Sequence, residues 1–136
     1  MVDHELVAAV RGGLAELADP VKAPQMQRYM RSAMPFRGVQ APAWRPLARR
    51  LARERPLADV AVLAATVREL WHGAQFREER YVALELTLGR RWRTLELLPL
   101  YEELIVDGAW WVAFVEAHPN LSALSRREAT RRLPVG

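Results

Sequence analysis

Apolar residues recur at intervals of three and four along most of this 136-residue chain, and no stretch shows the strict apolar-polar alternation of a half-exposed strand. Residues 3–18 show the pattern clearly, with apolar side chains at Leu6, Val7, Val10, Leu14 and Leu17. Spacings of three and four place such side chains on one face of an α-helix. The sequence therefore predicts an all-α fold.

Proline and glycine divide this pattern into short segments. Asp19-Pro20 indicates a helix N-terminus, Pro35 forbids a helix beyond about residue 34, and Asp59 caps or opens another helix. Gly73 and Gly89 are expected to follow helix ends, and Pro46 is expected to lie in a first turn. The expected helices cover residues 3–18, 20–32, 42–55, 59–73, 75–89, 95–108 and 109–118, with a loop at 33–41 and a link at 90–94.

Two segments of the chain repeat one arrangement. RELWHGAQF and ELIVDGAWW both pass from an apolar helix end through Gly-Ala into an aromatic residue, and their glycines, Gly73 and Gly108, lie 35 residues apart. A period of this length is typical of paired helices in HEAT or tetratricopeptide-like solenoids. The prediction becomes a helical-repeat solenoid.

The composition excludes several classes of protein. The chain has no cysteine, and His4, His72 and His118 lack partners at the spacing that places two metal ligands on one helix face, so we expect no metal site. No apolar run approaches the roughly 18 residues of a membrane span. We expect a soluble, cytoplasmic protein without a membrane partner.

Charge is distributed unevenly along the chain. The net charge is +4, but residues 1–19 carry four acidic residues against one basic residue, whereas residues 20–55 carry nine basic residues against Glu54 alone. A surface of one sign attracts polyanions, which favours nucleic acid as the partner. The alternative is a solvated helix face in an arginine-rich sequence.

The basic block contains regularly spaced candidates for contacts with phosphates. Arg45, Arg49 and Arg53 recur every fourth residue, and Arg28 and Arg31 lie three apart, so each set shares one helix face. The candidate nucleic-acid-binding residues are Lys22, Arg28, Tyr29, Arg31, Arg37, Arg45, Arg49 and Arg53. Among the aromatic residues, Tyr29 and Phe36 are weaker candidates for stacking, whereas Trp44 and Trp71 are expected in the core.

The loop and its flanks resemble a known family. QMQRYMRSAMPFRGVQAP, residues 25–42, resembles the YMK-x-x-x-PF-x-GV segment of the DNA alkylation repair family, the AlkD-like DNA glycosylases, and Arg31 takes the place of the lysine. AAVRGGLAELADPVKA, LWHGAQFREERYVALEL and LLPLYEELIVDGAWW extend the resemblance over about residues 1–111. It implies a right-handed HEAT-like solenoid that holds duplex DNA on a concave basic face and excises N3- or N7-alkylated purines without a cofactor.

The chain departs from the family where catalysis is implied. The family's WWD-x-VD pattern places a tryptophan against the lesion and an aspartate beside the sugar as the base departs; here Trp110 and Trp111 are followed by Val112 and Val115 at the aspartate positions. Trp111 remains the candidate for packing on sugar and base. Glu116 is a weak substitute carboxylate, because a shift of one position turns a helical side chain by about 100°.

Three hypotheses about function remain open. The first is a glycosylase for alkylated purines; the second is a non-catalytic module that binds duplex DNA; the third is a protein-interaction scaffold, because a fold does not fix a function. We expect a HEAT-like domain over residues 1–118 and a divergent tail over residues 119–136, either native or read in an altered frame. The family is longer, so an exposed solenoid end that self-associates is also expected.

Overall fold

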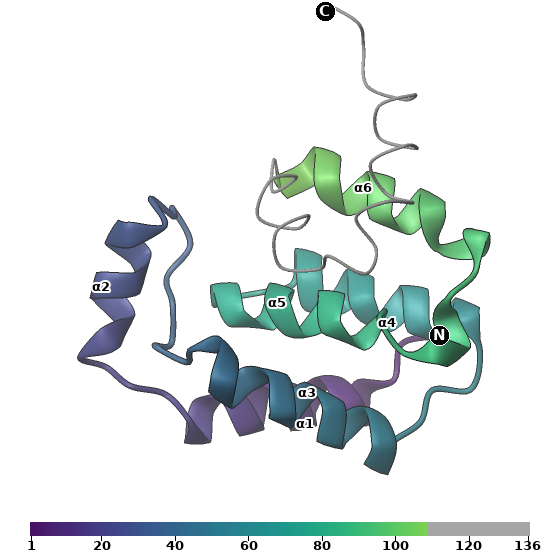
Figure 1. The fold of residues 1–136 in the computed structure, drawn as a ribbon, viewed down its shortest axis with the longest axis horizontal. Helices are drawn as coiled ribbons and strands as arrows, with labels where there is room; N and C mark the ends of the chain where they lie inside the picture. The colour runs from purple at the N-terminus through teal and green to yellow at the C-terminus, as the bar shows by residue number, and fades with distance from the viewer. Residues whose placement is uncertain (109–136) are drawn as a thin grey trace, which may run out of the picture. The chain divides into compact units, whose positions relative to one another are not determined.

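The computed structural model describes residues 1–108, and this part of the chain contains helices and no strand (Figure 1). The α-helices are α1 (His4–Glu16), α2 (Lys22–Tyr29), α3 (Ala41–Glu54), α4 (Val60–His72), α5 (Arg77–Leu86) and α6 (Leu98–Gly108). Two short 3₁₀ turns, Arg90–Trp92 and Leu95–Leu97, lie between α5 and α6. The prediction of an all-α fold is confirmed.

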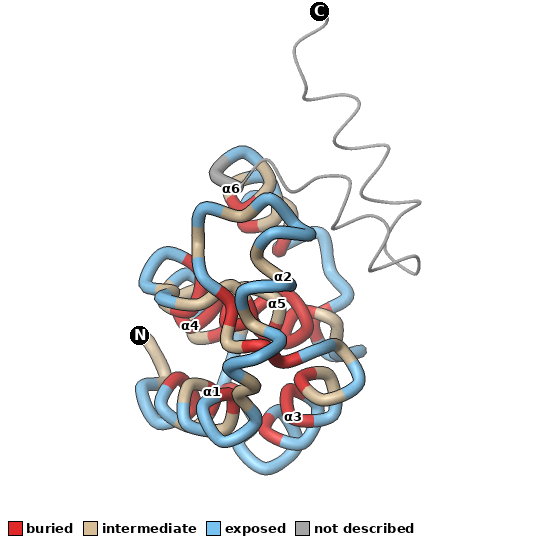
Figure 2. Tube along the Cα trace, turned by 90° about the vertical axis from the view of Figure 1, so that its left-hand side faces the viewer, coloured by how far each residue is buried: buried red, intermediate tan, exposed pale blue. Residues whose placement is uncertain are grey.

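The chain divides into two compact units, of which the first spans Met1–Leu95 and the second begins at Glu96. In the first unit, α5 packs against α1, α3 and α4, and α1 also packs against α3 and α4. Figure 2 shows the buried residues on the facing sides of these four helices. Their core contains Leu6, Val10, Leu14, Leu47, Leu51, Leu63, Val67, Leu70, Trp71, Val82 and Ala83. Burial of each leucine contributes about 1.5–3 kcal/mol, so packing rather than helix propensity holds this unit together.

Aspartates begin two of these helices. The carboxylate of Asp3 accepts a hydrogen bond from the backbone N–H of Leu6 at 3.0 Å, and that of Asp59 accepts one from Val62 at 2.9 Å. The backbone N–H of Asp3 also donates to the hydroxyl of buried Thr66 at 3.0 Å, which fixes the start of α1 to α4. The predicted helix start at Asp59 is confirmed, and such caps contribute roughly 1 kcal/mol each.

Helix α2 is shorter than the sequence suggested. It begins at Lys22 rather than at Pro20, with Val21 in the N-cap position, although the carboxylate of Asp19 accepts hydrogen bonds from the N–H groups of Val21 and Lys22. The helix ends at Tyr29 rather than near residue 32, because Arg31 adopts a left-handed backbone with φ of 50°. The N–H of Ser32 then bonds the carbonyl of Gln27, and that of Arg31 bonds Arg28, which is the Schellman arrangement that usually ends in glycine.

Helix α2 also differs from α1, α3, α4 and α5 in its packing. None of its residues is buried, and in Figure 2 it shows only intermediate and exposed positions. The segments at its two ends join it to α1 and to α3 (Figure 1). Only Ala23, Met26 and Gln27 are partly buried, so the two segments at its ends contribute much of what holds this helix in the first unit.

Several sequence expectations about helix ends were wrong. Leu17 is 43% exposed, because α1 ends at Glu16 before the apolar stripe returns to the core. Helix α5 ends at Leu86 and not at Gly89, because both the backbone N–H and the hydroxyl of Thr87 bond the carbonyl of Leu84.

The proline and linker expectations for the first unit also need correction. Pro46 lies inside α3, beyond the first turn, and has no N–H to donate to the carbonyl four residues earlier, at Pro42. Both positions are exposed, so this carbonyl can reach water. Residues 90–94 are more than a link: the guanidinium of Arg91 donates to the carbonyls of Leu57 and Ala58, which ties this segment to the connection between α3 and α4.

In the second unit, the described residues include α6, which reaches Gly108, the last of them, so the predicted helix end at this glycine stays a prediction. Leu100 and Leu104 are buried, and Val106 is exposed. The helix expected at residues 109–118 and the tail at residues 119–136 lie outside the described residues. Among residues 1–108, no helix is both long and apolar enough to cross a membrane.

Candidate nucleic-acid interface

Helix α3 presents the arginine stripe predicted from the sequence, which consists of Arg45, Arg49 and Arg53. Its opposite face is fixed in the core by buried residues, namely Trp44, Leu47, Ala48 and Leu51. Because residues four apart share a helix face, the stripe turns toward solvent, with Arg49 and Arg53 exposed and Arg45 partly buried. Local sequence thus places three cations in one row.

The three arginines of the stripe have different surroundings. The guanidinium of Arg45 lies over the ring of Trp44, 5.3 Å from its centroid. The Nε of Arg49 lies 3.3 Å from a carboxylate oxygen of nearly buried Glu85 on α5, while 65% of the Arg49 side chain remains exposed. No carboxylate of the described residues pairs with Arg53. Arg53 is therefore the member of the stripe best able to bind a phosphate.

Acidic partners of the basic block come from elsewhere in the sequence. Arg55 bonds Glu5 at 3.0 Å, and Arg49 pairs with Glu85, 36 residues away. The sequence interpretation treated the block as nearly free of acidic neighbours, which is wrong for these two arginines. Only tertiary packing brings those carboxylates to them.

Helix α2 and the turn that ends it present a second group of candidates. The prediction that Arg28 and Arg31 share one helix face is wrong, because Arg31 lies beyond the end of α2 in a left-handed conformation. Tyr29 is 87% exposed, and Arg28 and Arg31 are exposed beside it. Among the described residues no carboxylate pairs with Arg28 or Arg31. The Nζ of Lys22 lies 3.4 Å from the side-chain oxygen of Gln40, a long hydrogen bond to a neutral group. The positive charges of α2 thus remain available to an anion.

The loop between α2 and α3 is joined to the start of α5 by two Phe-Arg pairs. The guanidinium of Arg37 lies over the ring of Phe76 at 4.0 Å, and that of Arg77 lies over Phe36 at 5.9 Å. The N–H of Arg77 also donates to the carbonyl of Pro35 at 2.9 Å. The Nε of Arg37 is buried, so this candidate is partly engaged within the protein.

The aromatic residues separate into core and surface. Trp44 stacks on Tyr81, with ring centroids 5.7 Å apart and planes at 27°, and Phe36 lies against the same tyrosine at 6.2 Å. Trp44, Trp71 and Phe36 are all buried. The prediction that the two tryptophans belong to the core is confirmed, and stacking by Phe36 on a base is excluded by its burial. Tyr29 remains the exposed aromatic residue of the candidate set.

Burial affects the chemistry of Tyr81 in this aromatic cluster. Desolvation raises the pKa of its phenol above 10.0, and the charge and hydrogen bond of Arg77 act in the opposite direction. A proton is therefore held on this hydroxyl at neutral pH. Tyr81 contributes packing to the interface and no negative charge.

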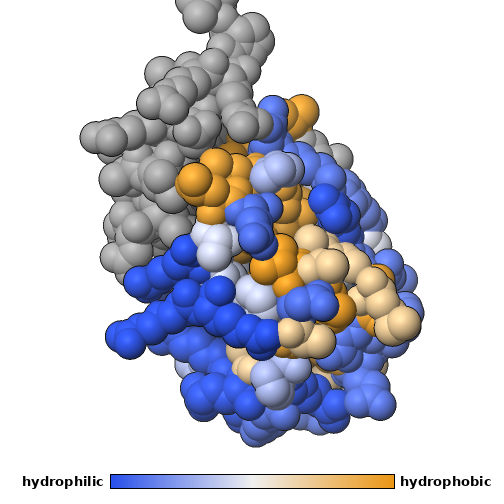
Figure 3. All heavy atoms as spheres, turned by 90° about the vertical axis from the view of Figure 1, so that its right-hand side faces the viewer, coloured by the Kyte–Doolittle hydropathy of each residue, from blue (hydrophilic) through white to orange (hydrophobic). Residues whose placement is uncertain are grey.

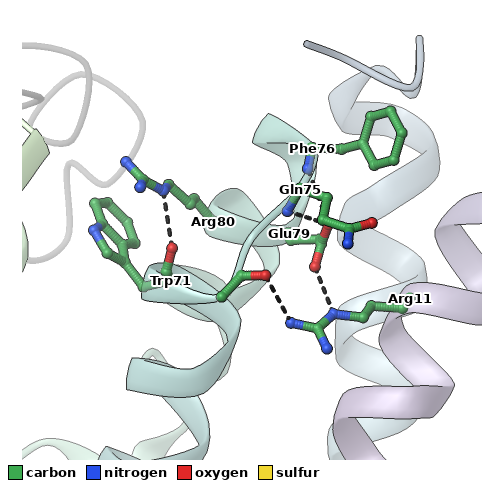
Figure 4. Close-up of polar contacts among 7 residues, drawn as sticks. Arg11, Trp71, Gln75, Phe76, Glu79 and Arg80 are labelled. Carbon is green, nitrogen blue, oxygen red and sulfur yellow. Dashed lines mark hydrogen bonds and ion pairs between the residues drawn. The ribbon is translucent and has the colours of Figure 1, made fainter. Parts of the chain in front are cut away.

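Two buried carboxylates begin α5. Glu78 accepts hydrogen bonds from the backbone N–H groups of Arg37, Gly38 and Val39 at 2.9–3.1 Å. The carboxylate of its neighbour Glu79 accepts a hydrogen bond from the guanidinium of Arg11 at 2.7 Å (Figure 4). The two glutamates thus hold different segments of the chain against one helix end.

Figure 4 shows the contacts around Glu79. Its second oxygen accepts the backbone N–H groups of Gln75 and Phe76, and Arg11 also bonds the carbonyl of Gly73 at 3.1 Å. The guanidinium of Arg80 bonds the carbonyl of Trp71 in the same view. These contacts fix the turn between α4 and α5 and point to no ligand.

Sequence reasoning missed Glu78, Glu85 and Arg77, which the fold brings to the basic loop and stripe. Glutamate in a first helical turn is ordinary, because it favours the helix dipole, so neither Glu78 nor Glu79 gave a signal of burial. Glu85 lies on α5 within the run of buried residues Val82–Leu86, and a charge in such a run could have suggested a pairing role.

The remaining site predictions are not tested by the described residues. Trp111, Val112, Val115 and Glu116 lie outside residues 1–108. Within that range, no group of three or more histidine and carboxylate side chains is arranged to hold a metal ion.

Figure 3 shows one face of the molecule, on which long hydrophilic side chains gather along one flank beside apolar ones.

The helices, their packing and the arginine stripe define an all-helical protein, over the described residues, with a row of cations on one helix. The chain belongs to the DNA alkylation repair enzyme family, whose model matches residues 10–113. The match includes Trp110, Trp111 and Val112 and ends before Val115. A comparison with curated proteins returned no match. The resemblance stated from the sequence and the HEAT-like all-α fold are confirmed.

Proposed function

We propose that this protein binds duplex DNA through sequence-independent phosphate contacts made by α2 and α3. The observation that carries the proposal is the stripe of Arg45, Arg49 and Arg53 on the solvent side of α3, of which Arg49 and Arg53 are exposed, in a chain whose family repairs alkylated DNA. A protein that neutralises phosphates with arginine releases counterions, and this supplies most of the affinity of non-specific binding. The regular spacing suits a row of phosphates along one strand.

The contacts that each candidate arginine already makes within the protein indicate how much it should contribute to DNA affinity. Arg53 and Arg28 pair with no carboxylate of the described residues, so binding a phosphate costs them no existing ion pair. Arg49 must share its guanidinium with Glu85, and Arg37 is stacked on Phe76. We therefore expect the largest losses of affinity at Arg53 and Arg28 and smaller ones at Arg49 and Arg37.

We propose that base excision is lost or strongly weakened in this chain. An alkylated purine leaves as a good leaving group, and the positive charge that develops on the sugar requires a carboxylate nearby. Valine stands at 112 and 115, where the family resemblance places aspartates, and an apolar side chain cannot offset that charge. Glu116 is the substitute carboxylate, one position away, and Trp111 remains the residue that would pack on the lesion.

Binding is tested with the full chain and a fluorescent, unmodified DNA duplex, by anisotropy over a range of salt concentrations. Arg53→Ala is expected to weaken binding equally for unrelated sequences and to reduce the slope of log affinity against log salt by roughly 0.9. Arg50→Ala is the matched control, because Arg50 lies on the same helix, outside the stripe, and near Glu54 at 3.8 Å. Equal effects of the two substitutions would remove the stripe from the interface.

Catalysis is tested by release of 7-methylguanine from alkylated duplex DNA, with the native chain, Val115→Asp and a protein-free blank. We expect no release by the native chain. Release by the native chain that is abolished by Glu116→Gln would instead assign the catalytic role to Glu116. Binding without release leaves the non-catalytic DNA-binding hypothesis in place.

A further inference from the structure

Helix α2 carries exposed cationic and aromatic side chains but buries none of its own residues. A helix of this length is marginal in water without packing, because nucleation is costly and one face must usually be buried. Something outside the helix must therefore hold it in place. The structure offers the two segments at its ends.

The segment after α2 is held by a carboxylate. One oxygen of Glu78 accepts the N–H groups of Gly38 and Val39, both at 2.9 Å, and of Arg37 at 3.1 Å. The other oxygen accepts the N–H of Arg37 at 2.9 Å. Glu78 is fully buried, so water cannot replace it as the acceptor for these groups. Each buried N–H left without a partner would be destabilising.

The segment before α2 is joined to the same loop. The N–H of Asp19 donates to the carbonyl of Arg37 at 2.8 Å, while the carbonyl and carboxylate of Asp19 accept the first N–H groups of α2. The backbone of Gly38 approaches Asp19 closely, and a Cβ built on Gly38 would lie 2.1 Å from the Asp19 carbonyl oxygen. Asp19, Arg37–Val39 and Glu78 together form what we name the α2 clasp.

We infer that Glu78 is a positioning residue, which fixes α2 through the α2 clasp and thereby fixes where Arg28 and Arg31 lie when the protein binds DNA. Glu78 is buried and so cannot itself touch DNA. Its effect on binding passes through Asp19 and the loop to both ends of α2. The DNA part of this inference rests on the proposed function; the fixing of α2 does not.

The chain supplies a matched control for this role. Glu79 is equally buried, is adjacent on α5, and also accepts backbone N–H groups, but it holds the turn at Gln75 and Phe76 and the side chain of Arg11. None of these side-chain hydrogen bonds of Glu79 reaches Asp19 or residues 37–39. A role specific to α2 predicts different consequences for Glu78→Gln and Glu79→Gln, whereas general destabilisation predicts the same consequences for both.

The first measurement is amide hydrogen exchange of the full chain without DNA. Glutamine can place its one accepting oxygen where Oε2 of Glu78 accepts three N–H groups, but its NH₂ group then faces the N–H of Arg37 and the negative charge is lost. Glu78→Gln should therefore speed exchange in α2, residues 22–29, on the order of tenfold, with α1 and α4 unchanged. Glu79→Gln should leave α2 at the native rate. Native exchange in α2 of Glu78→Gln, or equal acceleration in every helix, would overturn the inference.

The second measurement is a double-mutant cycle with the duplex-binding assay. Arg28→Ala should reduce the salt slope by roughly 0.9 in the native background and by nothing further in Glu78→Gln, because α2 then no longer faces the DNA. Equal losses in both backgrounds would overturn the positioning role. A native chain that does not bind DNA would defeat the proposed function, while the exchange experiment would still decide whether Glu78 fixes α2.

A second variant approaches the α2 clasp from its other side. Gly38→Ala leaves the Glu78 carboxylate intact but forces Asp19 and the loop apart. It should reproduce the faster exchange of α2 and the lost contribution of Arg28. If Glu78→Gln does not fold, Gly38→Ala carries the same test, and native exchange in α2 of this variant would overturn the inference.

Discussion

Replacement of Arg31 by glycine is expected to stabilise the protein while weakening its binding to DNA. Arg31 has φ of 50° and closes the Schellman arrangement at the end of α2. A residue with a Cβ pays about 1–2 kcal/mol for the left-handed backbone, and glycine pays none. Glycine loses about 0.5–1 kcal/mol more backbone entropy on folding, so the expected gain is about 0.5–1 kcal/mol.

The control for this prediction is Arg31→Ala, which also removes the guanidinium but keeps the Cβ. Urea denaturation should give a higher midpoint for the glycine variant than for the alanine variant, at equal slope, and a melting temperature about 2–4 °C higher. Since α2 buries no residue, the turn that ends it should respond to the relief of strain, and the amides of Arg31 and Ser32 should be better protected from hydrogen exchange in the glycine variant. Equal midpoints and equal protection in the two variants would refute the assignment of strain to Arg31. Both variants should lose the same phosphate contact.

Further outcomes are expected at other positions. Gly38→Ala should lower the free energy of unfolding by about 2 kcal/mol or more, measured by urea denaturation, because its Cβ would meet the Asp19 carbonyl; a native midpoint would contradict that close approach. Arg11→Ala should cost about 2 kcal/mol in the same assay, because it leaves buried Glu79 without its cation, and a loss as small as that of an exposed arginine would count against the pair. The raised pKa of Tyr81 means that the unfolded chain releases its phenolic proton first, so stability should fall as pH rises above about 10, and Tyr81→Phe should flatten that fall in denaturation measured from pH 8 to 12.

The positions of the helices along the chain were largely predictable from local signals. Apolar spacing identified the buried faces of α1 and α3, and Asp59 and Gly73 marked helix ends that the structure confirms. These signals act over one or two turns, so they can be read from neighbouring residues. The end of α2 could not be predicted, because an arginine at Arg31 gives no sign of a left-handed backbone.

The candidate interface was predictable in its cations and not in their partners. The spacing of the arginines on α3 was sufficient to place them on one solvent face. The pairing of Arg49 with Glu85 and the hydrogen bonds of Glu78 to residues 37–39 join positions about 40 residues apart. Such contacts depend on tertiary packing, for which neither periodicity nor composition carries information. The same holds for the burial of Phe36.

Because α2 has no buried residues, its positions are under different constraints from those of the core helices. Substitutions in the core helices change folding and surface together, because each position there is constrained by neighbours. Positions on α2 answer only to helix formation and to whatever the helix touches. Its charge and aromatic content can therefore drift or be redesigned over many variants while the core stays constant, which makes α2 the natural segment in which to alter affinity for a polyanion by directed evolution.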